Sequence, residues 1–302
     1  MSVIETRGLT KRYGETRGIQ NVDLRVEGGE IFGFLGPNGA GKTTTIRLLL
    51  NLINPTSGQV FLFGQPVERQ SVELRNEVGY LPGELRLYER MTGQQMLDYM
   101  GRFQHDKPPA RQRELLDALD LSPADLKRPM RFYSQGMKRK IGIVQAMQHD
   151  PNLLILDEPT EGLDPLMQQS FYQLLHDYRD RGRTVFMSSH ILPEVEEVCG
   201  RVGLIRGGEM VAVEEVEELH RRHVRRLKLV TATPLDAPPL IEPGITLHSQ
   251  EGTEATLFVT GAVDLKAMLS KLAQLDLVDL TFEPAKLEDF FLQYYNRKRH
   301  HD

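Results

Sequence analysis

The sequence has a single cysteine, Cys199, among its 302 residues. One cysteine excludes a disulfide within the chain, and the lack of disulfides fits a reducing compartment. We predict that Cys199 is a small buried apolar side chain rather than a reactive thiol.

The sequence also has no apolar run close to the ~18 residues that suggest a membrane-spanning helix. Its beginning, MSVIETRG, has neither the basic nor the apolar region of a signal peptide. We therefore expect a cytoplasmic protein that reaches a membrane only through a partner.

Excess charge of one sign is missing as well, because 37 Lys and Arg face 42 Asp and Glu, which gives a net charge of −5. Such a chain has no global field that would attract nucleic acid or anionic lipid, so we expect no nucleic-acid partner. The apolar fraction of 40% and the charged fraction of 26% are those of an ordinary globular protein.

Residues 1–220 alternate short apolar runs with helical patterns, which predicts an α/β fold with a partly parallel sheet. The stretch 85–150 has helical periodicity and few strand signals, and Gly207–Gly208 indicates a tight hairpin. Three runs have the character of buried strands that end in small or polar residues, EIFGFLG at 30–36, NLLILDE at 152–158 and TVFMSSH at 184–190.

The composition changes after Leu219. A basic run, HRRHVRRLK, and a proline-rich stretch, TPLDAPPLIEPG, indicate a boundary followed by a loop. Residues 225–302 then predict a small α+β domain without a catalytic constellation. Its expected elements are two strands around Gly252, a helix whose apolar stripe runs from Leu265 to Leu275, the strand LVDLTF, and a final helix marked by Leu287, Phe290, Phe291 and Tyr294.

Residues 36–44, GPNGAGKTT, fit the phosphate-binding pattern G-x-x-x-x-G-K-[ST] and lie between a predicted strand and a predicted helix. Glycines let backbone N–H groups surround an anion, and the helix N-terminus adds its dipole. Lys42 would reach the terminal phosphates of a nucleotide, and the Thr43 hydroxyl would bind Mg²⁺. A glycine-rich turn with an incidental lysine is the alternative, which the flanking strand and helix disfavour. The predicted nucleotide-binding residues are Gly36, Pro37, Asn38, Gly39, Ala40, Gly41, Lys42, Thr43 and Thr44.

LLILDEP supplies a complementary acid pair at the carboxyl end of a buried strand, where ligands bind in open α/β sheets. We predict that Asp157 holds Mg²⁺ and that Glu158 is the base that orients or polarises the attacking water. His190 ends a third such strand, so parallel strands would bring it to the same edge, near the γ-phosphate or the water. The alternatives are a helix-capping acidic pair and a structural histidine.

A helix is expected to begin at YSQGMKRKI, residues 133–141. Its first turn carries Lys138, Arg139 and Lys140, and cations there oppose the helix dipole. This arrangement suggests that something negative lies in front of the helix.

Four segments, in their order along the chain, resemble the nucleotide-binding domain of ATP-binding cassette (ABC) ATPases. They are the phosphate-binding loop at 36–44 (the P-loop), YSQGMKRK, LLILDEPTEGLD and SSH. In that family the serine-glycine stretch is a signature motif that closes over ATP held by the P-loop of a second copy. The resemblance implies that Ser134 and Gly136 face the γ-phosphate of a partner copy, whose charge would tolerate the cations of this helix. A solvated basic face accounts for the cations nearly as well.

Two further residues match family positions. Tyr13, in LTKRYGE, matches the aromatic residue that stacks on adenine, an interaction worth ~1–3 kcal/mol by analogy with base stacking elsewhere. A tyrosine that packs a turn is the alternative. Asp164, in EGLDP, matches the loop that crosses the dimer interface.

The resemblance implies the P-loop NTPase fold over 1–220, with a helical subdomain at about 85–150. The ending EPAKLEDFFLQYY is similar to the accessory C-terminal domain of ATPases that serve drug and antibiotic exporters. The implied function is the ATP-hydrolysing subunit of a membrane exporter, with ATP and Mg²⁺ as cofactors. Two copies would pair around two ATP molecules and drive a separate transmembrane permease through the span 83–105, at the cytoplasmic face of the membrane.

Several positions depart from the family pattern. Gly83 replaces the usual glutamine after GYLP, so either Glu84 substitutes for it or the metal keeps another water. Gln135 stands where glycine is usual, Met137 replaces the final glutamine of the signature, and Glu161 replaces a small residue. The nucleotide-binding and catalytic residues are all present, so the sequence still predicts an active ATPase.

Two other functions are alternatives. A soluble ABC ATPase that acts on ribosomes or DNA usually has two cassettes or long coiled-coil insertions, whereas this chain has one P-loop and no sustained heptads. A P-loop kinase would leave YSQGMKRK and TEGLD without a role.

Overall fold

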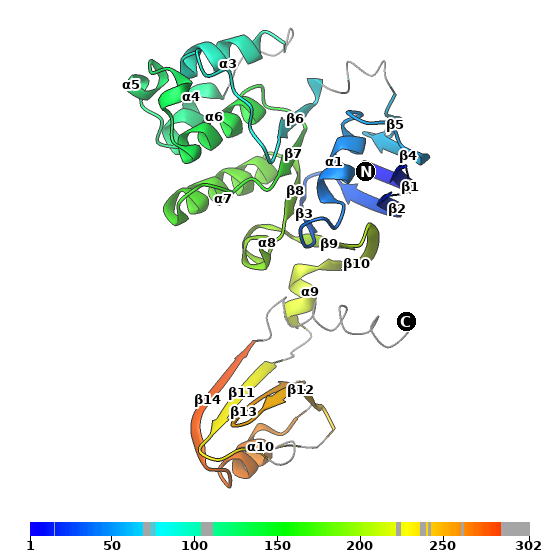
Figure 1. The fold of residues 1–302 in the computed structure, drawn as a ribbon, viewed down its shortest axis with the longest axis vertical. Helices are drawn as coiled ribbons and strands as arrows, with labels where there is room; N and C mark the ends of the chain where they lie inside the picture. Colours follow the sequence, from blue (N-terminus) through cyan, green and yellow to red (C-terminus); the bar gives the residue numbers. More distant parts are fainter. Residues whose placement is uncertain are drawn as a thin grey trace. The chain divides into compact units, whose positions relative to one another are not determined.

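A computed structural model describes residues 1–14, 16–68, 74, 76–103, 111–221, 225–235, 240, 243–260 and 263–284. The chain divides into two compact units, Met1–Glu214 and Glu215–Asp302, and each is described by itself. Figure 1 labels the helices and strands of both units.

A six-stranded sheet forms the centre of the first unit, in the order β10-β9-β3-β8-β7-β6. Each of the neighbouring pairs from β9 to β6 is parallel. Every residue of β3, β7 and β8 is buried, as expected of parallel strands covered on both faces. The strands are β3 (Ile31–Leu35), β6 (Val78–Leu81), β7 (Leu153–Asp157), β8 (Thr184–Ser189), β9 (Arg201–Arg206) and β10 (Glu209–Glu215).

A second, antiparallel sheet has the order β2-β1-β4-β5, and the sequence analysis did not single out its strands. Apolar side chains of this sheet, Ile4, Val22 and Val60 among them, pack in one core with those of β3 and α1. The strands are β1 (Ser2–Tyr13), β2 (Thr16–Glu27), β4 (Ser57–Leu62) and β5 (Gln65–Pro66).

Helices of the first unit form two groups. One group accompanies the central sheet and consists of α1 (Lys42–Leu49), α7 (Pro165–Asp180) and α8 (Leu192–Val198). The other group gathers on one side of the unit in Figure 1 and occupies the stretch predicted to be helical, 85–150. It contains α3 (Gly93–Gly101), α4 (Gln112–Ala118), α5 (Pro123–Leu126), the 3₁₀ turn Met130–Phe132 and α6 (Gln135–Met147).

Local sequence explains where four of these helices begin. The side chains of Thr92, Ser122, Ser134 and Asp164 each accept a hydrogen bond from a backbone N–H in the first turn that follows. Such caps satisfy N–H groups that have no partner inside the helix. The helix starts are therefore fixed by short-range chemistry.

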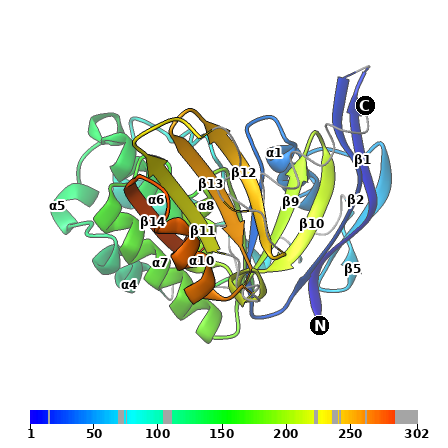
Figure 2. The ribbon, with the colours of Figure 1, turned by 90° about the horizontal axis from the view of Figure 1, so that it is seen from below.

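The second unit contains a four-stranded antiparallel sheet in the order β12-β13-β11-β14. Figure 2 shows α10 (Leu265–Leu272) against one face of this sheet, where Met268 and Leu272 join the core. The remaining elements are α9 (Val216–Arg221), β11 (Arg225–Thr231), β12 (Ile245–Glu251), β13 (Glu254–Val259) and β14 (Leu277–Pro284). The two strands around Gly252, the helix and the strand LVDLTF are confirmed, whereas the final helix predicted at Leu287–Tyr294 lies outside the described residues.

The basic run HRRHVRRLK, for which the sequence predicted no strand, ends inside one. Arg225–Thr231 forms β11, which pairs with both β13 and β14. Leu227 and Leu229 are fully buried in the core of this unit, while Arg226 and Lys228 alternate with them and pair with glutamates of neighbouring strands. The alternation has the period of a half-buried strand, which the basic residues concealed.

Helices long and apolar enough to span a membrane are absent from the parts of the chain that the structure describes.

We expect Cys199 to be unreactive in the folded protein. Its side chain is buried, and burial raises the pKa of its thiol, with a smaller contribution from nearby Glu194 and Glu30. The thiolate is the reactive species, so a thiol-specific reagent such as DTNB at pH 8 should react stoichiometrically in guanidinium chloride but hardly at all in the native protein. Equal rates in the two states would contradict this prediction.

Candidate active site

The predicted phosphate-binding loop connects β3 to α1 and has no room for a side chain at Gly36 or Gly41. A Cβ on Gly36 would collide with the carbonyl oxygen of Ile205, and Gly41 has a φ of 111° beside Ile19. A left-handed φ is open to glycine and costly for other residues. The loop therefore brings its backbone close to the start of α1, where free N–H groups can bind an anion.

A cavity of about 320 Å³ lies in front of this loop. Tyr13, half exposed at the end of β1, lines it together with loop residues, and Lys11 lies 5.4 Å from the centre of the Tyr13 ring. The predicted residues that line the cavity are Tyr13, Asn38, Gly39, Gly41, Lys42, Thr43, Thr44 and Glu158. Gly36, Pro37 and Ala40 complete the loop behind them.

The Lys42 ammonium is buried, and it contacts both the phosphate-binding loop and the carboxylate of Glu158. It donates to the carbonyl oxygens of Gly36, at 2.6 Å, and Pro37, at 3.3 Å. It also pairs with Oε1 of Glu158 at 3.1 Å. The lysine thus connects the phosphate-binding loop directly to the predicted base.

Thr43 and Asp157, the two residues predicted to bind Mg²⁺, lie in contact. The Thr43 hydroxyl donates to Oδ2 of Asp157 at 2.9 Å, and the hydroxyl of Ser188 donates to Oδ1 at 2.6 Å. A hydroxyl and a carboxylate are hard oxygen ligands of the kind that Mg²⁺ prefers. These residues fit a magnesium site that a nucleotide's phosphates would complete.

Glu158 stands one residue beyond β7 in a strained backbone conformation. Its φ is 48°, an uncommon value for a residue with a side chain, and its N–H donates to the carbonyl oxygen of Ser188. Oε2 of its carboxylate lies 2.8 Å from Nδ1 of His190. Backbone strain of this kind concentrates at functional sites.

Parallel pairing explains why distant sequence segments meet here. Leu35 is in register with Ser189, and Asp157 is in register with Ser188, so β3, β7 and β8 end at one edge of the sheet. His190 therefore lies at the edge where the sequence analysis expected it, in contact with Glu158 rather than isolated.

Ser134 and Gly136 stand apart from this cavity, at the exposed start of α6. The Ser134 hydroxyl accepts from the N–H of Met137 at 3.2 Å. A Cβ on Gly136 would lie 2.9 Å from the carbonyl oxygen of Gly162, so the signature stretch packs closely on the loop that precedes α7. The side chain of Gln135 lies over Gly162, which leaves no open space between these two segments.

Both readings of Arg139 made from the sequence, a cation beside a triphosphate and part of a solvated basic face, are wrong. Only 3% of the residue is exposed, and its guanidinium donates to backbone carbonyl oxygens of the segments 82–83 and 157–159. The helix turns this position inward, which the run of three cations did not reveal. Lys138 and Lys140 are half-buried.

Glu194 is a second buried charged residue that the sequence analysis missed. Its carboxylate accepts from the hydroxyls of Ser189, at 2.9 Å, and Thr160. It thereby joins the end of β8, next to His190, to the loop that follows Glu158. Its place between the apolar residues of α8 was the available signal, because an acid on a buried helix face needs partners.

Glu84 does not take the place of the missing glutamine in this structure. Its side chain is 91% exposed and lies 3.9 Å from that of Arg86. A Cβ on Gly83, in contrast, would lie 3.5 Å from Oδ2 of Asp157. The backbone at position 83 therefore approaches the carboxylate, and no side chain extends from it.

Comparison with known proteins gives consistent results. Residues 19–161 match the ABC transporter family. The chain is 35% identical to the ABC transporter ATP-binding protein YcbN of Bacillus subtilis, with 97% of each chain covered. It is 33% identical to the bacitracin transport ATP-binding protein BcrA of Bacillus licheniformis, again with 97% of each covered.

Among solved structures, the chain is similar to the ATP-binding subunit of an ABC transporter. The TM-score is 0.67 at 28% sequence identity, and the alignment covers 72% of this chain and 92% of the other.

Proposed function

This chain belongs to the ATP-binding proteins of ABC transporters, which are ATPases that drive transport, and we propose that it works as a pair of copies closed around two ATP molecules. Each copy would supply the P-loop, Asp157 and Glu158 to one ATP, and Ser134 and Gly136 to the other. The observation that carries this proposal is the exposure of Ser134 at the start of α6, outside the cavity that its own P-loop lines.

We assign roles to the residues of the cavity from their contacts. Tyr13 would stack on adenine, and the backbone N–H groups of 38–44 would surround the phosphates. Lys42 would turn from Glu158 to the terminal phosphates, because their charge exceeds that of one carboxylate. Thr43 and Asp157 would hold Mg²⁺, which neutralises charge on the phosphates.

Glu158 would orient and deprotonate the attacking water. One oxygen of its carboxylate pairs with Lys42 until nucleotide draws the lysine away, and the other lies against Nδ1 of His190. The strained φ of Glu158 fixes the carboxylate at the edge of the sheet. Lys42, Glu158 and His190 all belong to one copy of the chain.

A separate permease would dock on the helical side of the first unit. An aromatic cluster consists of Tyr88, Tyr99 and Phe103, whose rings meet edge to face at 5.7 and 5.2 Å. Tyr88 is 55% exposed and Phe103 is 58% exposed. Exposed aromatic side chains that line a hollow mark interaction sites.

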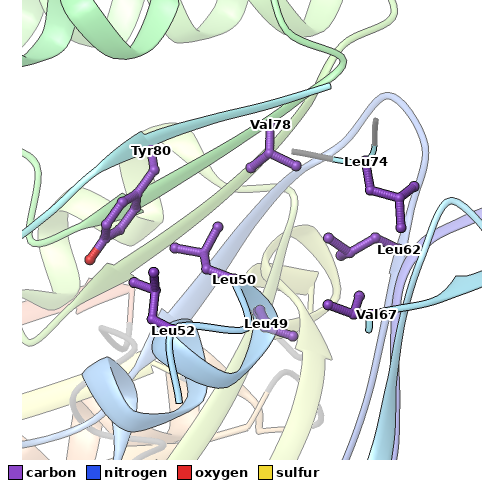
Figure 3. A pocket seen from close by; sticks show the side chains of 8 residues that line it. All are labelled: Leu49, Leu50, Leu52, Leu62, Val67, Leu74, Val78 and Tyr80. Atoms are coloured by element: carbon purple, nitrogen blue, oxygen red, sulfur yellow. The ribbon is translucent and has the colours of Figure 1, made fainter. Parts of the chain in front are cut away.

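The hollow extends along the surface of this unit. The aromatic cluster lines a cavity of about 420 Å³ that also includes Val78 and Tyr80. These two residues line a second, almost entirely apolar cavity of about 180 Å³ as well, which Figure 3 shows with leucines of α1 and the following turn pointing into it. We propose that an apolar segment of the permease occupies this surface and holds the chain at the cytoplasmic face of the membrane.

The name of the bacitracin relative indicates transport of an antibiotic, and the second unit would be the accessory domain whose resemblance to exporter ATPases favours export. We therefore propose export of an antibiotic-like compound. A ribosome- or DNA-directed ATPase is not favoured, since the relatives are transporter proteins.

Serine substitutions at Tyr88 and Phe103 test whether the permease docks on the aromatic cluster. The purified wild-type chain should release ADP and phosphate from ATP with Mg²⁺, and from detergent-solubilised membranes it should copurify with a protein of several membrane spans. The double variant Tyr88→Ser/Phe103→Ser should lose that protein and keep its ATPase rate, because the cluster lies outside the nucleotide cavity.

Leu265→Ser, which changes an exposed leucine of the second unit, is the matched control and should retain the membrane protein. Phosphate transfer to a small molecule in place of free phosphate would instead indicate a kinase. Copurification with ribosomes would indicate the soluble class of ABC ATPase.

A further inference from the structure

All five N–H donors of the Arg139 guanidinium meet backbone carbonyl oxygens. Nε donates to Pro159 at 2.8 Å, and Nη1 donates to Pro82 at 2.8 Å and Gly83 at 3.0 Å. Nη2 donates to Asp157 at 2.9 Å and to Glu158. A guanidinium has this number of donors, so none remains for another ligand.

Burial of this cation carries a cost that its hydrogen bonds and nearby carboxylates offset. Burial lowers the pKa of Arg139, and nearby Glu161, Asp157 and Glu158 act in the opposite direction. Loss of the guanidinium would leave five carbonyl groups without these bonds, whereas a lysine has one nitrogen and cannot reach both segments. The side chain is therefore matched to a specific backbone arrangement.

Arg139 joins two loops that the sheet itself does not hold together. The register between β6 and β7 ends at the pair Leu81 and Leu156, and both chains continue beyond it. One continuation, from Pro82, leads to the aromatic cluster. The other carries Asp157 and Glu158. At Gly83, where the first loop comes nearest to Asp157, there is no side chain to make the connection.

We propose that Arg139 is a positioning residue that holds the loop after β6 to the loop of Glu158, so that nucleotide binding at the active site changes the loop leading to the aromatic cluster. This inference rests on the proposed ATPase function and adds to it the residue that links the loop of the hydrolytic carboxylate to the loop of the docking surface. The route lies within one copy of the chain.

Hydrogen–deuterium exchange of the full chain tests this route. In a Glu158→Gln background, which should hold ATP without hydrolysing it, ATP with Mg²⁺ should protect peptides from 36–46, 157–163 and 82–92. Addition of Arg139→Met should leave the protection of 36–46 intact and abolish that of 82–92. Lys140→Met, which removes a cation from the next position of the same helix, should preserve all three responses.

Kinetics give a second readout in chains with Glu158 intact. Arg139→Lys should lower kcat by about 100-fold, the effect of a small displacement of a catalytic group, with KM unchanged because the P-loop is untouched. A merely structural role would lower kcat and stability without separating the two protected regions.

The outcomes separate the two proposals. Absence of protection at 36–46 in the Glu158→Gln parent would reject the nucleotide site itself. Protection at 36–46 together with unchanged protection of 82–92 in the Arg139→Met chain would reject the role of Arg139 alone. If the Arg139→Met chain does not fold, the same comparison is made with Arg139→Lys, which keeps the charge.

Discussion

Glu158→Gln is expected to slow ATP hydrolysis by about 10²–10⁴-fold, the usual contribution of a general base, while ATP binding persists. Glutamine has the shape of glutamate but cannot take a proton from water. The change also removes the negative partner of Lys42, at 3.1 Å, so the ammonium is freed for the phosphates. Binding should therefore be kept or strengthened.

The same variant should change the oligomeric state. If two copies close around ATP and open only after hydrolysis, a chain that cannot hydrolyse stays closed. We expect a monomer without nucleotide and a dimer with ATP and Mg²⁺ when the mass is measured by light scattering during size-exclusion chromatography. Phosphate release measured on the same fractions links the two effects.

Glu84→Gln is the matched control, since it makes the same chemical change on a carboxylate that is 91% exposed. Its hydrolysis should equal that of the wild type. A Glu158→Gln chain that hydrolyses ATP within tenfold of the wild-type rate would show that another group is the base. A strong effect of Glu84→Gln would show that Glu84 turns toward the phosphates when nucleotide binds.

Short-range patterns were sufficient to predict the residues that the site brings together. A glycine-rich loop between a strand and a helix, and polar residues at the ends of buried strands, are local features. Parallel pairing then carries Gly36, Asp157 and His190 to one edge of the sheet without further information. Thr43 and Asp157 are far apart in sequence, but the pattern of buried parallel strands is enough to place them at the same edge of the sheet.

Residues whose role depends on what packs against them were not predictable. Arg139 is one of three successive cations, and only the position of β6 and β7 decides which of the three points inward. Glu194 needs hydroxyl groups from two other segments. Tyr99 and Phe103 are four residues apart, but Tyr88 joins them only because the loop before α3 lies against that helix. A single sequence gives the identity of each side chain but not which distant residues pack against it.

The strand β11 was missed for a related reason. Arg225, Arg226 and Lys228 made its sequence look solvated, although Leu227 and Leu229 alternate with them. The glutamates that pair with Arg226 and Lys228 lie on other strands, so the local sequence shows only unpaired positive charge. Their ion pairs allow a basic segment to occupy the middle of a sheet.

Ser134→Arg is expected to lower hydrolysis by about 100-fold, the cost of losing a well-placed donor to developing charge, although its own P-loop is intact. The hydroxyl is replaced by a long side chain at the surface that would approach the partner's ATP. The monomer should still bind ATP, because Ser134 is not one of the described residues that line the nucleotide cavity. Affinity for a fluorescent ATP analogue and phosphate release measure the two effects.

Mixing two inactive variants distinguishes a shared site from a site within one chain. Lys42→Ala should abolish productive ATP binding, because it removes the ammonium at the phosphates. In a heterodimer of Ser134→Arg with Lys42→Ala, the intact P-loop of one copy meets the intact signature stretch of the other. One of the two sites is then complete, and random pairing of equal amounts should restore up to about a quarter of the wild-type rate.

This recovery has no explanation within a single chain, since each variant alone lacks one half of the machinery. A mixture of Ser134→Arg with wild type is the reference for subunit exchange. A mixture of two differently tagged Ser134→Arg chains should stay inactive. If the Ser134→Arg and Lys42→Ala mixture remains inactive while the tags show that heterodimers form, the active site does not span two copies. The exposed start of α6 would then need a different ligand, and the paired arrangement proposed for this ATPase would be wrong.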